Sequence, residues 1–387
     1  MQKIVIVGAG IASLTAAEAL RQNGFEGKIT ILGEENTLPY QRPPLSKAYL
    51  TSDELPSPTP IRSPNFFRDN NIEFEQGCEV TALDRTAKQV VIQGGRKVQY
   101  DILILATGAR PRPIDLPGEN SKNVFYLRNF DHSAALRNAL SAPEHKKVAI
   151  LGAGVIGLEV ASAANLLGKQ VSVFEASSRA MCRVASPLTT NFVTNRMALD
   201  GVSFCFNACV NQILSEEDRV SGIRLSDGTT KPADVVVIGI GAVPNAELAQ
   251  DANLSCDGGI LVDSNMCSSD PDIFAIGDCA KAVNLSTNTP IRIETIHNAM
   301  LQAQIAAAHI CGKPSPPISP PRFWSDLNGM KVQCVGIATG YDRIQQRPTE
   351  NDNAREFWLF SGDRMIAAET VNLPTRQSKL SEALSER

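Results

Sequence analysis

The sequence lacks the cysteine and histidine patterns that mark redox or metal chemistry. Its nine cysteines include no C-x-x-C or C-x-x-x-x-C pair, and its four histidines show no metal-ligand spacing. Such spacings are the usual sequence sign of a zinc site or a catalytic disulfide. We therefore expect reduced thiols, no disulfide and no metal site.

Long apolar runs and an excess of basic residues are missing too. No stretch approaches the roughly 20 apolar residues needed to cross a bilayer. The formal net charge of −4 argues against a nucleic-acid partner, whose binding domain would be basic. Lys3 and the apolar run at 4–7 could pass for an export signal. The same run leads into a glycine-rich turn, so we expect no cleaved signal, no membrane partner and a cytoplasmic protein.

Two glycine-rich turns of the same kind are present, Gly8-Ala9-Gly10-Ile11-Ala12-Ser13 and Gly152-Ala153-Gly154-Val155-Ile156-Gly157. Each follows a β-branched run typical of a strand buried on both faces of a parallel sheet. Glycine permits a positive φ and a close approach of backbone N–H groups to a pyrophosphate, which the following helix stabilises. Ser13 replaces the third glycine of the first turn, where we expect a small side chain to suffice.

An acidic residue ends the second strand of each unit. Glu34 and Glu175 follow their turns by about 20 residues, where a carboxylate can accept both hydroxyls of an adenosine ribose. A single glycine-rich turn also occurs in ordinary strand–turn–helix structures. The repetition of strand, turn, helix and acid indicates two bound nucleotides.

The chain of 387 residues, 43% hydrophobic and 20% charged, predicts a globular protein of two or three domains. Residues after the apolar run 102–105 break regular structure, and the chain returns near 244 to a further apolar strand and an alanine-rich helix at 298–309. We expect a discontinuous first domain (1–112 and 244–320), a second domain (113–243), and a small α+β domain (321–387).

Several segments together resemble the FAD-dependent, NADH-using reductases of ferredoxins and rubredoxins, including reductase components of ring-hydroxylating dioxygenases and the putidaredoxin reductases. The resemblance covers nearly the whole chain and rests most on the run from Arg42 to Lys47. The other segments are Ala106-Thr107-Gly108, 154–159, 274–278, 292–295 and 323–326. It implies an α/β fold like that of glutathione reductase, with two Rossmann-like domains and the α+β C-terminal domain.

The resemblance implies FAD in the first unit and NADH in the second, with hydride transfer between the stacked rings. Such transfer needs alignment rather than acid–base groups. The implied FAD positions are Gly8, Gly10, Ile11, Ala12, Ser13, Glu34, Arg42, Lys47, Val80, Ala106, Thr107, Gly108, Arg128, Gly277, Asp278, Ile296 and Trp324. The implied NAD positions are Gly152, Gly154, Val155, Ile156, Gly157, Glu159, Glu175 and Gly241.

The resemblance assigns catalytic roles to Lys47, beside flavin N5, and to Glu159, which can pair with it. Similar peroxide and coenzyme A disulfide reductases carry a redox cysteine where this chain has Lys47, which excludes their chemistry here. Each residue also has an ordinary interpretation: a solvated lysine and a helix-surface glutamate. Likewise, Asp278 could cap a helix, and Trp324 could be a core residue.

The implied acceptor is a ferredoxin or rubredoxin, most typically an acidic [2Fe–2S] ferredoxin that serves an oxygenase. Candidate docking residues near the C-terminal domain are Arg322, Lys331, Arg343 and Arg347. Two alternatives remain: an oxidase that reduces oxygen or small acceptors, and an interaction flavoprotein resembling apoptosis-inducing factor. Ile11, His297 and the shortened segment 375–379 depart from the family pattern, and the last of these concerns the docking surface.

Overall fold

The computed structural model describes residues 1–54, 56–284 and 289–385, which fold into two compact units. Unit 1 consists of residues 1–41, 58–110 and 243–321. Unit 2 consists of residues 42–57, 111–242 and 322–387. Both units are discontinuous in the sequence, so each forms from segments that lie far apart along the chain.

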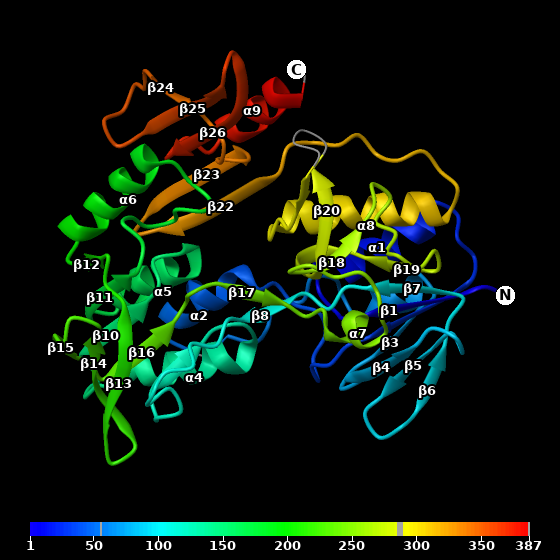
Figure 1. Ribbon diagram of the computed structural model, residues 1–387, viewed down its shortest axis with the longest axis horizontal. Coiled ribbons are helices and arrows are strands. Elements are labelled where there is room, and N and C mark those ends of the chain that lie inside the picture. The colour runs from blue at the N-terminus through cyan, green and yellow to red at the C-terminus, as the bar shows by residue number, and fades with distance from the viewer. Residues whose placement is uncertain (55, 285–288, 386–387) are drawn as a thin grey trace. The chain divides into compact units, whose positions relative to one another are not determined.

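Unit 1 contains a five-stranded parallel sheet (Figure 1). Its order is β19 (Ile273–Ala275), β7 (Ile102–Leu105), β1 (Lys3–Val7), β2 (Lys28–Leu32) and β3 (Ile72–Glu75). The central strand β1 has neighbours on both sides, and its residues from Ile4 to Val7 are buried. This burial explains the unbroken apolar run, since a strand covered on both faces has no position for a polar side chain.

Two helices of unit 1, α1 (Ile11–Gln22) and α8 (Ile296–Ile310), pack against each other. Small buried residues such as Ala16 and Ala303 permit their close approach.

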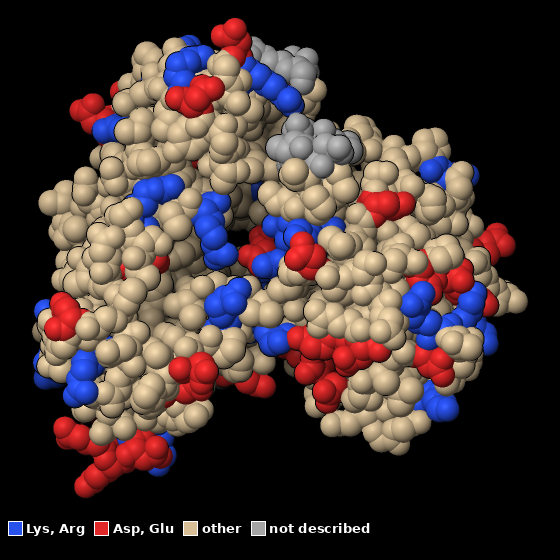
Figure 2. All heavy atoms as spheres, viewed as in Figure 1, with Lys and Arg blue, Asp and Glu red and all other residues tan. Residues whose placement is uncertain are grey.

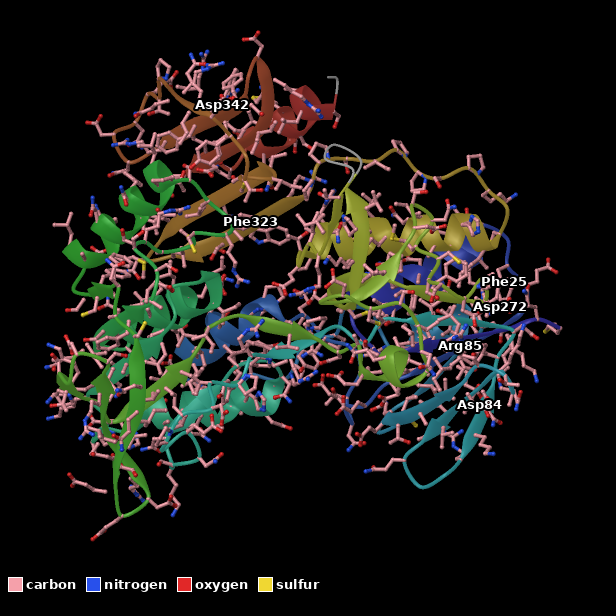
Figure 3. The ribbon with its side chains drawn as sticks, in the orientation of Figure 1. Phe25, Asp84, Arg85, Asp272, Phe323 and Asp342 are labelled. Carbon is pink, nitrogen blue, oxygen red and sulfur yellow. The ribbon has the colours of Figure 1, made fainter. Side chains whose placement is uncertain are left out.

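The remaining elements of unit 1 are β4 (Val80–Asp84), β5 (Gln89–Ile92), β6 (Lys97–Gln99), β18 (Ile260–Val262), β20 (Ala280–Asn284), β21 (Thr289–Ile291), α3 (Asn65–Asp69), α7 (Glu247–Asp251) and η2 (Gly277–Cys279). The turn after β4 is joined to the loop before β19 by an ion pair of Arg85 and Asp270, 2.7 Å apart. Figure 3 labels Arg85.

Unit 2 contains a second five-stranded parallel sheet. Its order is β12 (Ser203–Phe206), β11 (Gln170–Glu175), β10 (Lys147–Leu151), β16 (Val235–Ile238) and β9 (Val124–Tyr126). Its helices are α4 (Phe130–Ser141), α5 (Val155–Leu166) and α6 (Pro187–Leu199). An antiparallel sheet follows, formed by β13 (Val210–Glu216), β14 (Arg219–Leu225) and β15 (Thr230–Pro232).

The C-terminal part of unit 2 is an antiparallel sheet with one helix, α9 (Arg376–Ser385). The strand order is β22 (Arg322–Leu327), β23 (Met330–Gly336), β26 (Arg364–Val371), β25 (Arg355–Ser361) and β24 (Arg343–Arg347). Together with the two parallel sheets, this part confirms the expected α/β class with two Rossmann-like units and an α+β C-terminal portion. Alternation along β22 buries Ser325 and leaves Trp324 41% exposed on the other face.

The segment 42–57 belongs to unit 2, although the sequence placed it in the first domain. It contains η1 (Pro43–Ser46) and α2 (Ala48–Thr51). Leu50 is buried in the same apolar cluster as Leu158 of α5 and Leu327 of β22. This burial accounts for the grouping, because the segment contributes to the core of unit 2.

The chain passes between the units at β8 (Ala109–Pro111), at β17 (Ala242–Pro244) and just before β22. The boundaries expected at 112, 243 and 320 lie within two residues of these points. The division into three domains stays a prediction.

A buried carboxylate joins β26 to the start of α6 within unit 2. Glu369 accepts hydrogen bonds from the backbone N–H and the hydroxyl of Ser186, both at 2.6 Å, and from the Thr189 hydroxyl. Burial raises the pKa of Glu369, and the donors only partly oppose this effect.

The raised pKa of Glu369 predicts a pH-dependent stability. Its contribution is fully present below the unfolded pKa and is lost as the pH rises through the folded pKa, since the fold disfavours the charged form. We expect the unfolding temperature of the wild type to fall, relative to Glu369→Gln, as the pH rises above about 4.5. Scanning calorimetry would measure this, with the exposed Glu382→Gln on α9 as control. Parallel pH profiles for wild type and Glu369→Gln would contradict it.

Candidate functional site

The first glycine-rich turn joins β1 to α1 and has the backbone that the sequence predicts. Gly8 has a φ of +106°, and a Cβ there would lie 2.2 Å from the carbonyl oxygen of Ala106. Gly10 caps α1, and a Cβ on it would meet nothing within 4 Å. The turn therefore leaves open space beside the N–H groups that begin α1. This is the space a phosphate needs at a helix N-terminus.

The other expected FAD residues of unit 1 surround the carboxyl edge of its parallel sheet. Gly277 begins η2, one residue beyond the end of β19, and a Cβ on it would lie 3.2 Å from Cβ of Ala12. Ligands of open α/β sheets bind outside the carboxyl ends of the strands. At this edge, or beginning the adjoining elements, lie Gly8, Gly10, Ile11, Ala12, Ser13, Glu34, Ala106, Thr107, Gly108, Gly277, Asp278 and Ile296, while Val80 begins β4.

Two residues that the sequence did not single out position this edge. Gln302, buried on α8, accepts a hydrogen bond of 2.8 Å from the N–H of Gly277. The side-chain amide of Asn245 donates a hydrogen bond to the backbone carbonyl of Thr107. The backbone carbonyl of Asn245 in turn accepts one from the Thr107 hydroxyl. No local pattern marks such residues, because their partners lie 25 and 138 residues away in the chain.

The second glycine-rich turn joins β10 to α5. Gly152 has a φ of +100°, and a Cβ there would lie 2.5 Å from the carbonyl oxygen of Gly239. The turn also binds the expected acid: Glu175 accepts hydrogen bonds of 2.8 Å from the backbone N–H groups of Ala153 and Ser177. The Glu175 carboxylate is thereby fixed beside the turn. Gly154, Val155, Ile156 and Gly157 begin α5, as expected of a nucleotide-binding helix.

The loop after β11 folds back on the second turn. The N–H of Met181 donates to the carbonyl of Ala153 at 2.9 Å. Arg179 donates to the carbonyls of Ala185 and Cys182 within its own loop, at 2.8 and 3.0 Å. Its guanidinium therefore serves the loop itself.

Arg183 is a further residue that sequence reasoning missed. Its Nη2 lies 3.1 Å from the position that a Cβ on Gly241 would take, and the side chain is exposed. The arginine thus places a positive charge beside an expected NAD residue. Only its place eight residues after Glu175 could have marked it, which is a weak signal.

Lys47 and Glu159 form an ion pair within unit 2, with Nζ and Oε1 2.6 Å apart. Glu159 lies on α5 and is 4% exposed, whereas Lys47, at the end of η1, is 22% exposed. The Ser325 hydroxyl of β22 donates to the same oxygen at 2.6 Å, and the Ser46 hydroxyl donates to the other. The buried carboxylate is thus both paired and fully hydrogen-bonded, as buried charges require.

The remaining expected FAD residues, Arg42, Arg128 and Trp324, also lie in unit 2. Arg42 donates to the backbone carbonyl of Arg128 at 2.8 Å. Trp324 lies on β22, next to Phe323, which Figure 3 labels. The contacts of these residues and of Lys47 with a flavin stay predictions.

All nine cysteines are free thiols, and the described part of the chain contains no group of three or more His, Cys, Asp or Glu residues suited to a metal ion. Burial raises the pKa of Cys279 and of Cys334. Neither thiol is therefore activated as a nucleophile. Among the described residues, no helix is both long enough and apolar enough to cross a membrane.

Comparison with known protein families shows to which family the two nucleotide units belong. Residues 2–303 match the family described as pyridine nucleotide-disulphide oxidoreductase, and residues 322–387 match the reductase C-terminal domain. The chain belongs to the pyridine nucleotide-disulphide oxidoreductase family. Members of this family depend on FAD and NAD(H), and the open glycine turns and the placement of Glu175 fit both nucleotides.

Relatives of known activity within this family cover nearly the whole chain. A rubredoxin-NAD(+) reductase of Pseudomonas putida is 44% identical, and the alignment covers 97% of both chains. A putidaredoxin reductase of the same organism is 35% identical over 99% of this chain and 92% of its own. The crystal structure of a covalent putidaredoxin reductase–putidaredoxin complex matches with a TM-score of 0.95 and 35% identity, covering 100% of this chain and 93% of the other.

Proposed function

We propose that this oxidoreductase transfers electrons from NADH, through FAD, to a rubredoxin or ferredoxin that serves an oxygenase. The observation that carries the proposal is the ion pair of Lys47 with the buried Glu159. The segment 42–57, which contains Lys47, has no cysteine, so electrons cannot pass through a thiol there. They must leave for an external acceptor, and the named relatives use rubredoxin or putidaredoxin.

The chemistry that a bound FAD would supply is acceptance of a hydride from NADH and release of the electrons one at a time. The chain's own residues bind and orient the nucleotides. The turn at Gly8 and the N-terminus of α1 hold one pyrophosphate, and the turn at Gly152 with Glu175 holds the other nucleotide. Lys47 supplies a positive charge that favours electron density on the flavin, and Glu159 keeps that ammonium in place. The same proposal includes a cytoplasmic location, where NADH is generated.

Charge complementarity supports the acceptor assignment. Arg343 and Arg347 of β24 lie over the rings of Phe360 and Trp358, 4.1 and 4.5 Å from the ring centres. Stacking holds each guanidinium in one place on an edge strand, where an acidic partner can approach. Figure 2 shows basic side chains interspersed with acidic ones over this part of unit 2. The other two candidates, Arg322 and Lys331, lie on strands at the opposite edge of the sheet, so the four do not form one cluster.

We expect reduction of an acidic [2Fe–2S] ferredoxin or a rubredoxin to weaken with rising salt, since exposed charges are screened within about 10 Å at 0.1 M. The variant Arg343→Gln/Arg347→Gln should raise the KM for the acceptor roughly three- to tenfold and flatten the salt dependence, because each exposed pair is worth about 0.2–1 kcal/mol. The control is Arg224→Gln, an exposed arginine of β14.

The test is stopped-flow transfer from the NADH-reduced enzyme to a panel of rubredoxins and ferredoxins. Failure with every acceptor, together with rapid turnover of oxygen, would assign the chain to the oxidase class. Failure with both the panel and oxygen would favour an interaction role like that of apoptosis-inducing factor.

A further inference from the structure

The hydrogen bonds around Glu159 are more numerous than an ion pair needs. Its carboxylate receives the ammonium of Lys47 and two hydroxyls, from Ser46 and Ser325. Both serines are buried, at 2% and 0% exposure. A buried hydroxyl costs free energy unless it is hydrogen-bonded, and each of these two hydroxyls has the Glu159 carboxylate as its acceptor.

The two serines approach the carboxylate from different elements. Ser46 ends η1 and lies next to Lys47 in the chain, while Ser325 lies on β22 of the C-terminal sheet. The η1 segment has its own support, since the Ser133 hydroxyl of α4 donates to the carbonyl of Leu45 at 2.7 Å. The serine donors are therefore held by the fold and do not depend on the position of the lysine.

We propose that Ser46 and Ser325 are positioning residues that hold the Glu159 carboxylate in place, and through it hold the Lys47 ammonium where it can act on the flavin. This inference rests on the proposed function, because it assumes that Lys47 acts on the flavin. Without the serines, a carboxylate that is 4% exposed has the lysine as its only donor. The ammonium then loses its fixed position, because the carboxylate that holds it is no longer fixed by donors from the fold.

The contacts of Lys47 and of the two serines support this assignment. Lys47 is the more exposed member of the pair and makes one further contact, a long one of 3.4 Å to the carbonyl of Pro43. Ser325 shares oxygen Oε1 with Lys47, so its hydroxyl fixes the atom that binds the ammonium. Ser46 occupies Oε2, where Lys47 is not bound. Loss of either serine removes a fixed donor from the carboxylate that holds the ammonium.

The experiment compares Ser325→Ala and Ser46→Ala with wild type in the FAD-loaded enzyme. The matched control is Ser162→Ala. Ser162 lies on α5, as Glu159 does, and its hydroxyl accepts a hydrogen bond of 2.8 Å from the backbone N–H of Asn328, in the turn between β22 and β23. This control removes a comparable link between α5 and the C-terminal sheet without touching Glu159. Ser325→Thr keeps the hydroxyl and should restore the wild-type values.

Two quantities are measured: the anaerobic rate of flavin reduction by NADH, and the midpoint potential of the bound flavin. We expect each alanine variant to reduce the rate about tenfold and to lower the midpoint potential by up to about 30 mV. For a two-electron couple, 30 mV corresponds to about a tenfold change in the equilibrium constant for flavin reduction. The control variant should change neither. Unchanged values in both serine variants, or an equal loss in Ser162→Ala, would overturn the inference.

Flavin reduction by NADH needs no acceptor, so this result is independent of which protein receives the electrons. If Lys47→Met leaves the rate and the potential unchanged, the role of Lys47 in the proposed function fails. If Lys47→Met lowers both and the serine variants do not, only the present inference fails.

Discussion

Replacing Lys47 with methionine should slow the reduction of bound flavin by NADH about 100-fold while FAD remains bound. A fixed charge aimed at the reacting group typically contributes on the order of 10²–10³ in rate. The turn at Gly8, which we propose binds FAD, lies in unit 1 and does not include Lys47. Anaerobic stopped-flow absorbance gives the rate, and the flavin-to-protein absorbance ratio gives the FAD content. A wild-type rate in Lys47→Met would remove the lysine from the mechanism.

The single substitution also leaves the buried Glu159 carboxylate without its cation, which by itself destabilises a fold. The double variant Lys47→Met/Glu159→Gln separates the two effects. Because it removes both charges, it should recover most of the lost thermal stability. The slow flavin reduction should persist, since the ammonium is still absent. Recovery of the rate along with the stability would mean that Lys47 acts only on the fold.

Selectivity for NADH over NADPH should be at least about 100-fold in kcat/KM, about 2.7 kcal/mol at 1.36 kcal/mol per factor of ten. The Glu175 carboxylate is fixed by the N–H groups of Ala153 and Ser177, where a 2′-phosphate would meet a like charge. Arg179 bonds its own loop and is not directed at such a phosphate. Steady-state kinetics with both coenzymes measures the ratio.

The variant Glu175→Ala should reduce this selectivity roughly tenfold, chiefly by raising kcat/KM for NADPH, because it removes the negative charge that faces the 2′-phosphate. The control is Glu216→Ala, an exposed acid on β13 of the same unit. Equal use of the two coenzymes by the wild type, or an unchanged ratio in Glu175→Ala, would contradict the role of this carboxylate.

The two nucleotide units were predictable from sequence because their signals are local. A buried strand, a turn with a positive φ at Gly8 or Gly152, a helix and an acid fall within about 30 consecutive residues. Each part restricts the others, so the pattern identifies both units before any contact is known. The pair of Lys47 with Glu159 needed the additional resemblance, since the two residues are far apart in the chain.

The rest of the candidate site depends on contacts that no local pattern reports. Ser46 and Ser325 lie in the segments 42–47 and 323–326 that carry the resemblance, but they reach Glu159 across 113 and 166 residues, and neither segment shows that both hydroxyls meet one carboxylate. Arg183 is distinguished only by the position of its guanidinium beside Gly241. The placement of 42–57 in unit 2 likewise follows from the burial of Leu50. In each case tertiary packing, rather than propensity or spacing, decides the outcome.

The discontinuity of unit 2 constrains how the protein is made on the ribosome. Lys47 is synthesised early, but Ser325 and the apolar residues Leu327 and Val371, which share the cluster of Leu50, are synthesised near the end. The apolar residues of α5 and of the segment 42–57 that share this cluster must therefore remain exposed, or be shielded by a chaperone, until the last strands emerge. Evolution can exchange the surface of the C-terminal sheet to suit a new acceptor. It cannot exchange that sheet as a free module, because its inner face completes a core begun more than 300 residues earlier.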